Sequence, residues 1–109
     1  MANAYKVLGQ TGDASANDVS LYTVPSSTEA VISTIVVCNR ESATNTFRIA
    51  VKPDGATLSQ KHYLAYDSEI QANDTITLTL GITVDASDIV SVGASDTNVS
   101  FSLFGTEIT

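Results

Sequence analysis

The sequence is poor in the residue types that small proteins use for cross-links or for catalysis. Its 109 residues include one cysteine, one histidine and no tryptophan. A single cysteine excludes an intrachain disulfide, and the apolar run before Cys38 predicts a buried, unreactive thiol. His62 is the only histidine, so no second histidine can pair with it. Its distance in sequence from Cys38 suggests no pairing with that thiol either. These shortages predict a protein that is not an enzyme and holds no cofactor.

Positive charge is also scarce. Five basic residues stand against twelve acidic ones, which gives a net charge of −7. This balance opposes attraction to a phosphate backbone, so we expect no nucleic-acid partner. No apolar run approaches the ~20 residues that span a bilayer, so we expect no membrane partner. Residues 1–3 lack the basic start and apolar stretch of a secretory signal, which predicts assembly in a cytoplasm.

What the chain does contain is alternation of apolar and polar residues, separated by turn-forming clusters. About eight such segments recur at intervals of about 8–12 residues, which is typical of an antiparallel β-sandwich or jelly roll. We therefore predict a single all-β domain over residues 1–109. The predicted strands lie at 4–8, 19–24, 29–39, 46–51, 62–66, 75–82, 89–92 and 99–104, with a short segment at 69–71.

Two of these strands enclose the most informative stretch, residues 46–82. Pro53-Asp54-Gly55 predicts a turn directly after the first of them, and Asp67-Ser68 predicts another. The strand at 29–39 is apolar on both faces, which suits a central strand or one that packs on a neighbouring subunit. The predicted core-facing residues of the two enclosing strands are Phe47, Ile49 and Val51, and Ile76, Leu78, Leu80 and Ile82.

The excursion between those strands contains the candidate contact residues. His62, Tyr63 and Tyr66 lie close together in sequence, and Arg48 and Lys52 share the polar face of the preceding strand. Strict alternation predicts that Tyr63 faces opposite to His62 and Tyr66. We expect both basic side chains to pair with acidic residues, within the chain or across a subunit contact. The five residues form our predicted assembly or ligand surface.

Acidic residues offer no better site. The sets Asp85, Asp88 and Asp96, and Asp13 with Asp18, match no defined calcium loop, so we predict solvated turn residues and no metal. Asp67 and Glu69 have the spacing of a carboxylate pair. A glycosidase needs such a pair on facing elements of a cleft, whereas these two lie on one local segment.

A set of short motifs in a fixed order carries a resemblance to a known family. The motifs are YKVLGQ at 5–10, LYTVP at 21–25, VCNR at 37–40, TFRIAV at 46–51, KHYLAYD at 61–67, NDT at 73–75 with LGIT at 80–83, and FSLFG at 101–105. Over nearly its whole length the chain resembles small virion structural proteins of tailed bacteriophages.

The resemblance implies a compact β module of the virion with no catalytic residues to transfer. Its expected station is the tail, baseplate or fibre region, with capsid decoration as the alternative. Other virion proteins are the implied partners, and the symmetry of viral particles implies a homotrimer or a higher symmetric oligomer, assembled in the host cytoplasm. Serine- and threonine-rich outer strand faces suit repeated lateral contacts of this kind.

A function of another class is also open. The side chains of Tyr63, Tyr66 and His62 would form the stacking platform of a carbohydrate-binding, receptor-recognition module. The absence of tryptophan counts against it, because extended aromatic platforms favour the largest ring.

Overall fold

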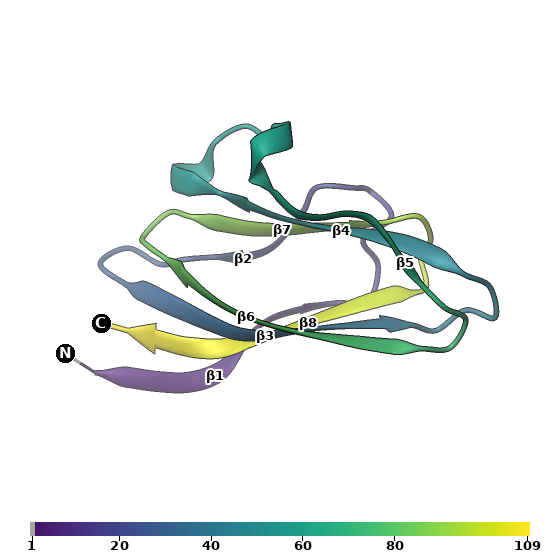
Figure 1. Cartoon of the computed structure of the whole chain (residues 1–109). Coiled ribbons are helices and arrows are strands. Elements are labelled where there is room, and N and C mark those ends of the chain that lie inside the picture. The colour runs from purple at the N-terminus through teal and green to yellow at the C-terminus, as the bar shows by residue number, and fades with distance from the viewer. Residues whose placement is uncertain (1) are drawn as a thin grey trace.

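The computed structural model describes residues 2–109 as two four-stranded antiparallel sheets packed face to face (Figure 1). The strands of sheet A are, in spatial order, β1 (Asn3–Thr11), β8 (Val99–Ile108), β3 (Glu29–Asn39) and β6 (Thr75–Val84). The strands of sheet B are β2 (Val19–Thr23), β7 (Ile89–Ala94), β4 (Asn45–Lys52) and β5 (Tyr63–Ile70). The predicted antiparallel β-sandwich is confirmed.

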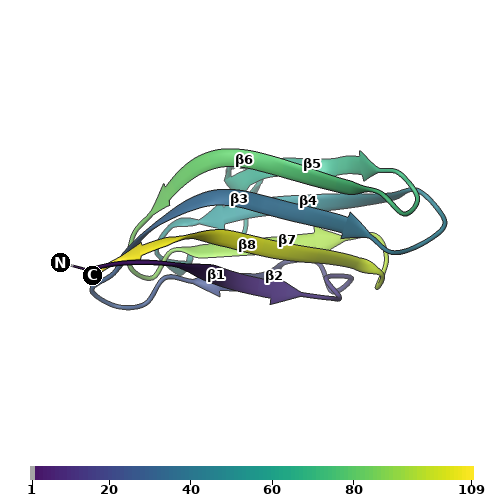
Figure 2. The same ribbon diagram turned by 90° about the horizontal axis from the view of Figure 1, so that it is seen from below.

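The order of the strands is that of a jelly roll. Successive strands cross from one sheet to the other except at β4 and β5, which are neighbours in sheet B (Figure 2). The order β1-β8-β3-β6 facing β2-β7-β4-β5 corresponds to two interlocked Greek keys. Both termini lie at one end, where the Ala2 and Thr109 backbones exchange hydrogen bonds of 2.9 Å.

The core lies between the sheets and is built from one face of every strand. Phe47 of β4 and Phe101 of β8 meet across it edge to face, with ring centroids 6.3 Å apart. Ile49 is fully buried beside them, and the predicted inward orientation of Val51, Ile76, Leu78 and Ile82 is confirmed by their packing against the core. The largest fully buried apolar side chains are Phe101, Ile32, Ile35, Ile49, Ile70, Leu103, Val24, Val37, Val90, Val92 and Val99.

The predicted inward orientation of Leu80 is wrong. Gly81 has φ of 62°, and the register between β3 and β6 shifts there from Ile32↔Ile82 to Thr34↔Thr79. The shift interrupts the alternation, so Leu80 lies 43% exposed. A bulge changes which face a residue occupies without changing the sequence pattern around it.

Element boundaries also differ from those predicted. Gly9 does not end the first strand, which continues past a bulge to Thr11. Asp67-Ser68 is not a turn between strands; it lies inside β5, where Asp67 has φ of 50°. The Pro53-Asp54-Gly55 turn is confirmed as the short 3-10 helix η1 (Pro53–Gly55), and a second, η2 (Gln60–His62), precedes β5.

Buried asparagines close the end of the sandwich that carries the β3–β4 loop. Asn39 is 1% exposed, and its amide nitrogen donates to the carbonyls of Ala43 and Gln71 at 2.8 and 3.1 Å. Its Oδ1 accepts from Asn45 Nδ2 at 3.1 Å, and Asn45 in turn accepts from Ser95. Every donor and acceptor so paired avoids the cost of burying an unsatisfied polar group.

A buried carboxylate joins the two sheets near the termini. Glu107 points inward from β8, receives the Tyr22 hydroxyl of β2 at 2.5 Å and pairs with Lys6 of β1 at 2.6 Å. The hydrogen bonds from Lys6 and Tyr22 lower the pKa of Glu107. Burial and the hydrogen bond to this carboxylate raise the pKa of Tyr22. The carboxylate is therefore held ionised inside the protein.

Candidate functional site

The outer face of sheet B carries a cluster that a bulge in β5 creates. The register between β4 and β5 shifts from Phe47↔Ser68 to Ile49↔Ala65, so that Tyr66 and Asp67 both lie opposite Arg48. A second shift follows before Tyr63. Tyr63 and Tyr66 consequently meet edge to face, with centroids 4.9 Å apart, although strict alternation predicted opposite faces.

Arg48 is the centre of this cluster. Its Nε and Nη2 donate to the two carboxylate oxygens of Asp67 at 2.7 and 3.3 Å. Its Cζ lies 4.2 Å from the ring centroid of Tyr66 and 5.9 Å from that of Tyr63, within cation–π range. The hydrogen bond from Arg48 lowers the pKa of Asp67. We call Arg48, Tyr63, Tyr66 and Asp67 the Arg48 cluster.

A polar hollow of about 330 Å³ adjoins the Arg48 cluster. It offers hydroxyl, amide, guanidinium and carboxylate groups, but the ion pair makes its charge close to neutral. Tyr66, which is 57% exposed, does not line the hollow, but its ring lies against Arg48, which does. The hollow is lined by Asn17, Thr46, Arg48, Asp67, Ala94 and Ser95.

His62 and Lys52, which we predicted to belong to the contact surface, are both buried within the chain. His62 is 7% exposed because it ends η2, where its Nδ1 accepts from the Ser59 amide at 3.0 Å. Lys52 is 8% exposed and its Nζ pairs with Asp18 at 2.9 Å. The predicted pairing of Arg48 and Lys52 with acidic residues is confirmed. Only Arg48, Tyr63 and Tyr66 of the predicted set remain accessible.

Loops cover much of the rest of this face. The β1–β2 loop brings Asp18 to Lys52 and buries Ala14 fully. Asn17 of the same loop lies directly on Gly93, so close that a Cβ there would collide with its side chain. Figure 1 shows the excursion between β4 and β5 standing above sheet B. The outer face of sheet B is thus charged and partly covered.

Four of the five predicted loop aspartates accept backbone amides, and the fifth, Asp18, pairs with Lys52. Asp13 accepts the amide of Ser15, and Asp96 accepts that of Asn98, each at 2.9 Å. Asp88 accepts the amides of Asp54 and Asp85 at 2.7 and 2.8 Å. Within residues 2–109 no group of three or more histidine, cysteine or acidic side chains is placed to hold a metal ion.

The outer face of sheet A differs in its chemistry. Cross-strand partners define its rows, and none of the residues in the four inner rows is charged. From the end near the termini, these rows are Tyr5, Thr106, Val31 and Thr83; then Val7, Phe104, Thr34 and Thr79; then Gln10, Ser102, Val36 and Thr77; then Ser100, Cys38 and Thr75. We call these rows the uncharged face. A charged residue, Glu29, first occurs in the next row toward the termini.

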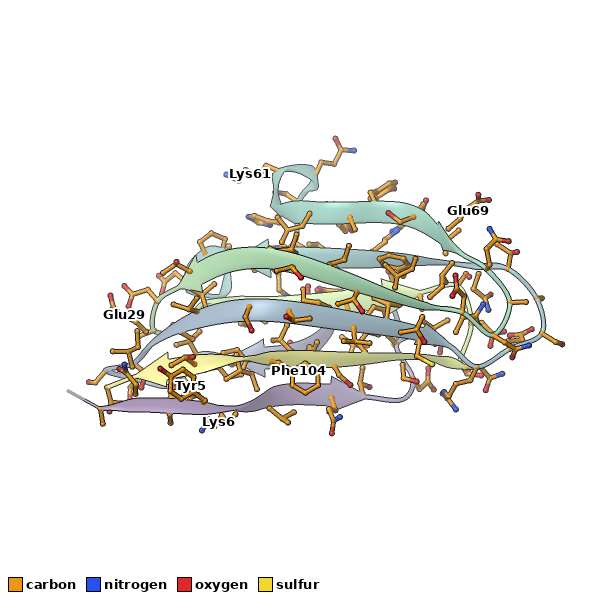
Figure 3. All side chains as sticks on the ribbon, turned by 60° about the horizontal axis from the view of Figure 1, so that its bottom comes forward. Tyr5, Lys6, Glu29, Lys61, Glu69 and Phe104 are labelled. Atoms are coloured by element: carbon orange, nitrogen blue, oxygen red, sulfur yellow. The ribbon has the colours of Figure 1, made fainter. Side chains whose placement is uncertain are left out.

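No loop in the described part of the chain lies over the uncharged face, which Figure 3 turns toward the viewer with Tyr5 and Phe104 labelled on neighbouring strands. Tyr5 is 81% exposed and Val7 49%. Cys38, predicted to be buried, is partly exposed here because its side chain points away from the core. Sequence alternation identified the serines and threonines of this face, but only the register shows that they form one continuous surface.

Comparison with known proteins identifies no family for this chain. No family model and no curated protein matches it. Among solved structures, a chain from "Structure of infectious bursal disease virus Gx strain" is similar, with a TM-score of 0.42 and 12% identity. The match covers 97% of the present chain, which spans about a third (32%) of that chain. Likeness at this level carries no functional argument. In residues 2–109 no helix is long and apolar enough to cross a membrane.

Proposed function

We propose that the protein is a non-enzymatic structural component of a tailed-phage virion, which assembles symmetrically through its β-sheet faces. The observation that supports assembly is the uncharged, uncovered outer face of sheet A. The phage context, the tail, baseplate or fibre station and the other virion proteins as partners come from the sequence resemblance. The assembled protein would reside in the virion after assembly in the host cytoplasm.

Electrostatics favour this face as the contact between copies. Each copy has a net charge of −7, so like-charged surfaces of two copies repel one another. The rows of the uncharged face bring no such pair together, and the charges nearest to them are Lys6 at the β1 edge and Arg40, whose Nε donates to Ser100 Oγ at 2.8 Å. The face presents aromatic and branched side chains among hydroxyl groups, and Tyr5, Val7 and Phe104 line a shallow hollow on it together with Lys6. Contact there would shield apolar area that is now exposed to water.

A charge placed in the middle of this face tests the proposal. Val36 lies in an inner row between Ser102 and Thr77, and its side chain points outward. Wild-type protein is expected to form a defined oligomer in light scattering, whereas Val36→Lys should be shifted toward a smaller species. Ser20→Lys, an exposed site on the outer face of sheet B, is the matched control and should leave the oligomer intact. A wild-type monomer that also fails to bind other virion proteins would overturn the proposal.

Capsid decoration is the alternative station. A decoration protein is present at a copy number comparable to that of the major capsid protein, whereas tail and baseplate components are far fewer. Quantitative proteomics of purified particles distinguishes the two.

The Arg48 cluster supports a second candidate, recognition of a carbohydrate. A sugar offers hydroxyl groups to the guanidinium, carboxylate and amide of the polar hollow and C–H groups to the ring of Tyr66. Tyr66→Ala should abolish binding to host glycans, while Tyr5→Ala, an exposed tyrosine on the other sheet, should not. Retention of all glycan binding by Tyr66→Ala, or no binding by wild type, would remove this candidate.

A further inference from the structure

The free edge of β6 is unlike the other three sheet edges. Exposed edges invite pairing with foreign strands, and proteins usually blunt them with charge, proline, bulges or short length. Edge strand β1 carries Lys6 and a bulge, β2 has only 5 residues, and β5 is bulged twice and carries Asp67 and Glu69. By contrast, β6 has 10 residues, TITLTLGITV, without a charge or a proline.

The backbone of β6 is satisfied on one side only. It pairs with β3 along its length, and no backbone hydrogen bond from the other described residues reaches its second side. Figure 2 shows β6 at the margin of sheet A with no strand beyond it. Its threonines are exposed, and its single irregularity is the bulge at Gly81. Residues 75–79 therefore form a regular, uncharged template for another strand.

We propose that β6 pairs antiparallel with β6 of a second copy about a twofold axis at Thr77. This pairing rests on the proposed function, since it specifies how copies assemble. Thr77 would face its own counterpart, with Thr75 opposite Thr79 and Ile76 opposite Leu78 of the other copy. Threonines then meet threonines on the outside and aliphatic side chains meet on the inside, which are favourable cross-strand pairs. An isologous contact needs such a self-complementary strand.

The size of the uncharged face shows what edge pairing would add to the proposed contact through that face. Four strands spaced ~4.8 Å apart and about 8 residues long give the face a footprint of about 500 Å². A stable interface buries about 800 Å² on each partner, so one sheet alone falls short. Pairing of β6 makes sheet A continuous across two copies. The outer face of that pair then offers a footprint of about 1,000 Å² to a further copy. The twofold pair implies an even number of copies, in place of the homotrimer that the resemblance suggests.

Pairing of β6 with β1 of a neighbouring copy is the competing arrangement. It would also be antiparallel, because the directions of β1 and β6 are opposite across the four strands of sheet A. Such a head-to-tail contact would build a ring or a filament. It would place the uncharged β6 against a strand that carries Lys6 and a bulge, so the observations favour the twofold contact.

Cysteine cross-linking tests the axis. In a Cys38→Ser background, Thr77→Cys places one thiol opposite its own counterpart, at the ~4.5–5.5 Å Cα separation of directly opposed residues, which a disulfide spans. Oxidation should give a covalent dimer on a non-reducing gel. The matched control Thr83→Cys lies on the same strand beyond Gly81 and would have no counterpart, so it should remain monomeric on the gel. Cross-linking of both or of neither variant overturns the proposed register.

Hydrogen exchange of the peptide 75–84 separates this inference from the proposed function. Edge pairing adds backbone hydrogen bonds, so the free-edge amides should exchange on the order of tenfold more slowly in wild type than in Thr77→Lys, where two ammonium groups would meet. Face-to-face docking adds none. An oligomer whose β6 amides exchange as in Thr77→Lys leaves the proposed function standing and overturns the edge pairing. Protection of both β1 and β6 without the Thr77→Cys cross-link assigns the head-to-tail contact instead. A wild-type monomer overturns the edge pairing, and it overturns the proposed function as well only if that monomer also fails to bind other virion proteins.

Discussion

The two outer faces of the sandwich have the same architecture and opposite chemistry. Sheet B carries Arg48, Lys52 and Asp67 on its outer face and has loops packed over it, so its polar groups find partners within the chain. The four rows of the uncharged face contain no charged residue, and no loop among residues 2–109 covers them. A surface whose charges pair within the chain needs no partner to neutralise them. An exposed, uncharged sheet buries apolar area when a neighbouring protein covers it. Under our proposals, assembly uses sheet A and any small-ligand recognition uses sheet B.

The largest expected effect concerns the core between the two sheets. Phe101 is 1% exposed and packs against Phe47 across the sandwich. Phe101→Ala should lower the free energy of unfolding by about 3–5 kcal/mol, because it removes a large buried side chain and leaves a cavity. Chemical denaturation measures the change. The control Lys61→Ala, on an exposed side chain of η2, should stay within about 0.5 kcal/mol of wild type. Equal losses in both variants would contradict the assignment of core and surface.

The sequence predicted correctly which residues face the core and which face the surface wherever a strand has no bulge. Alternation correctly placed Phe47, Ile49 and Val51 in the core, because the pairing of β4 with β7 is regular. It failed at Leu80, where a register shift beside Gly81 breaks the period of two.

The same physics explains why the Arg48 cluster was only partly predicted. Tyr63 and Tyr66 share a face only because β5 is bulged twice, and Asp67 resembles a turn residue in sequence since turns and bulges both accept positive φ. The burial of Lys52 depends on Asp18, 34 positions away in sequence. The uncharged face depends on how four strands align, and local pattern does not contain that register.

A second prediction tests whether the β1–β2 loop packs firmly on the outer face of sheet B. Gly93 leaves no room for a Cβ beneath Asn17, whereas a Cβ on Gly81 of sheet A would meet nothing. Gly93→Ala should destabilise the protein by about 1–3 kcal/mol through overpacking. Gly81→Ala should cost about 1 kcal/mol, from its positive φ alone. Thermal unfolding compares the two. A neutral Gly93→Ala would mean that the loop moves freely from the sheet.

The third prediction concerns the buried carboxylate that joins the sheets. The pKa of Glu107 is lowered, so its ionised form contributes stability above the unfolded value of about 4.3 and that stability is lost as pH falls below it. Glu107→Gln should cost about 1–3 kcal/mol at neutral pH, because Lys6 and Tyr22 lose a charged partner. The difference from wild type should shrink at pH 3. Measured unfolding free energies that differ equally at both pH values would contradict this role.

The smallest expected effect belongs to the ion pair on the surface of sheet B. Asp67 is exposed, and the pKa of its carboxyl is lowered by the hydrogen bond from Arg48, so the pair adds stability that acid or salt removes. Asp67→Asn keeps a residue that tolerates positive φ and should lower the melting temperature slightly at low salt. Glu69→Gln removes the same charge from the same strand without breaking this pair, so it should have no effect of its own. Because salt screens exposed charges, the two variants should converge at high ionic strength; a deficit in Asp67→Asn that persists there would show that the Arg48 cluster is held by contacts other than charge.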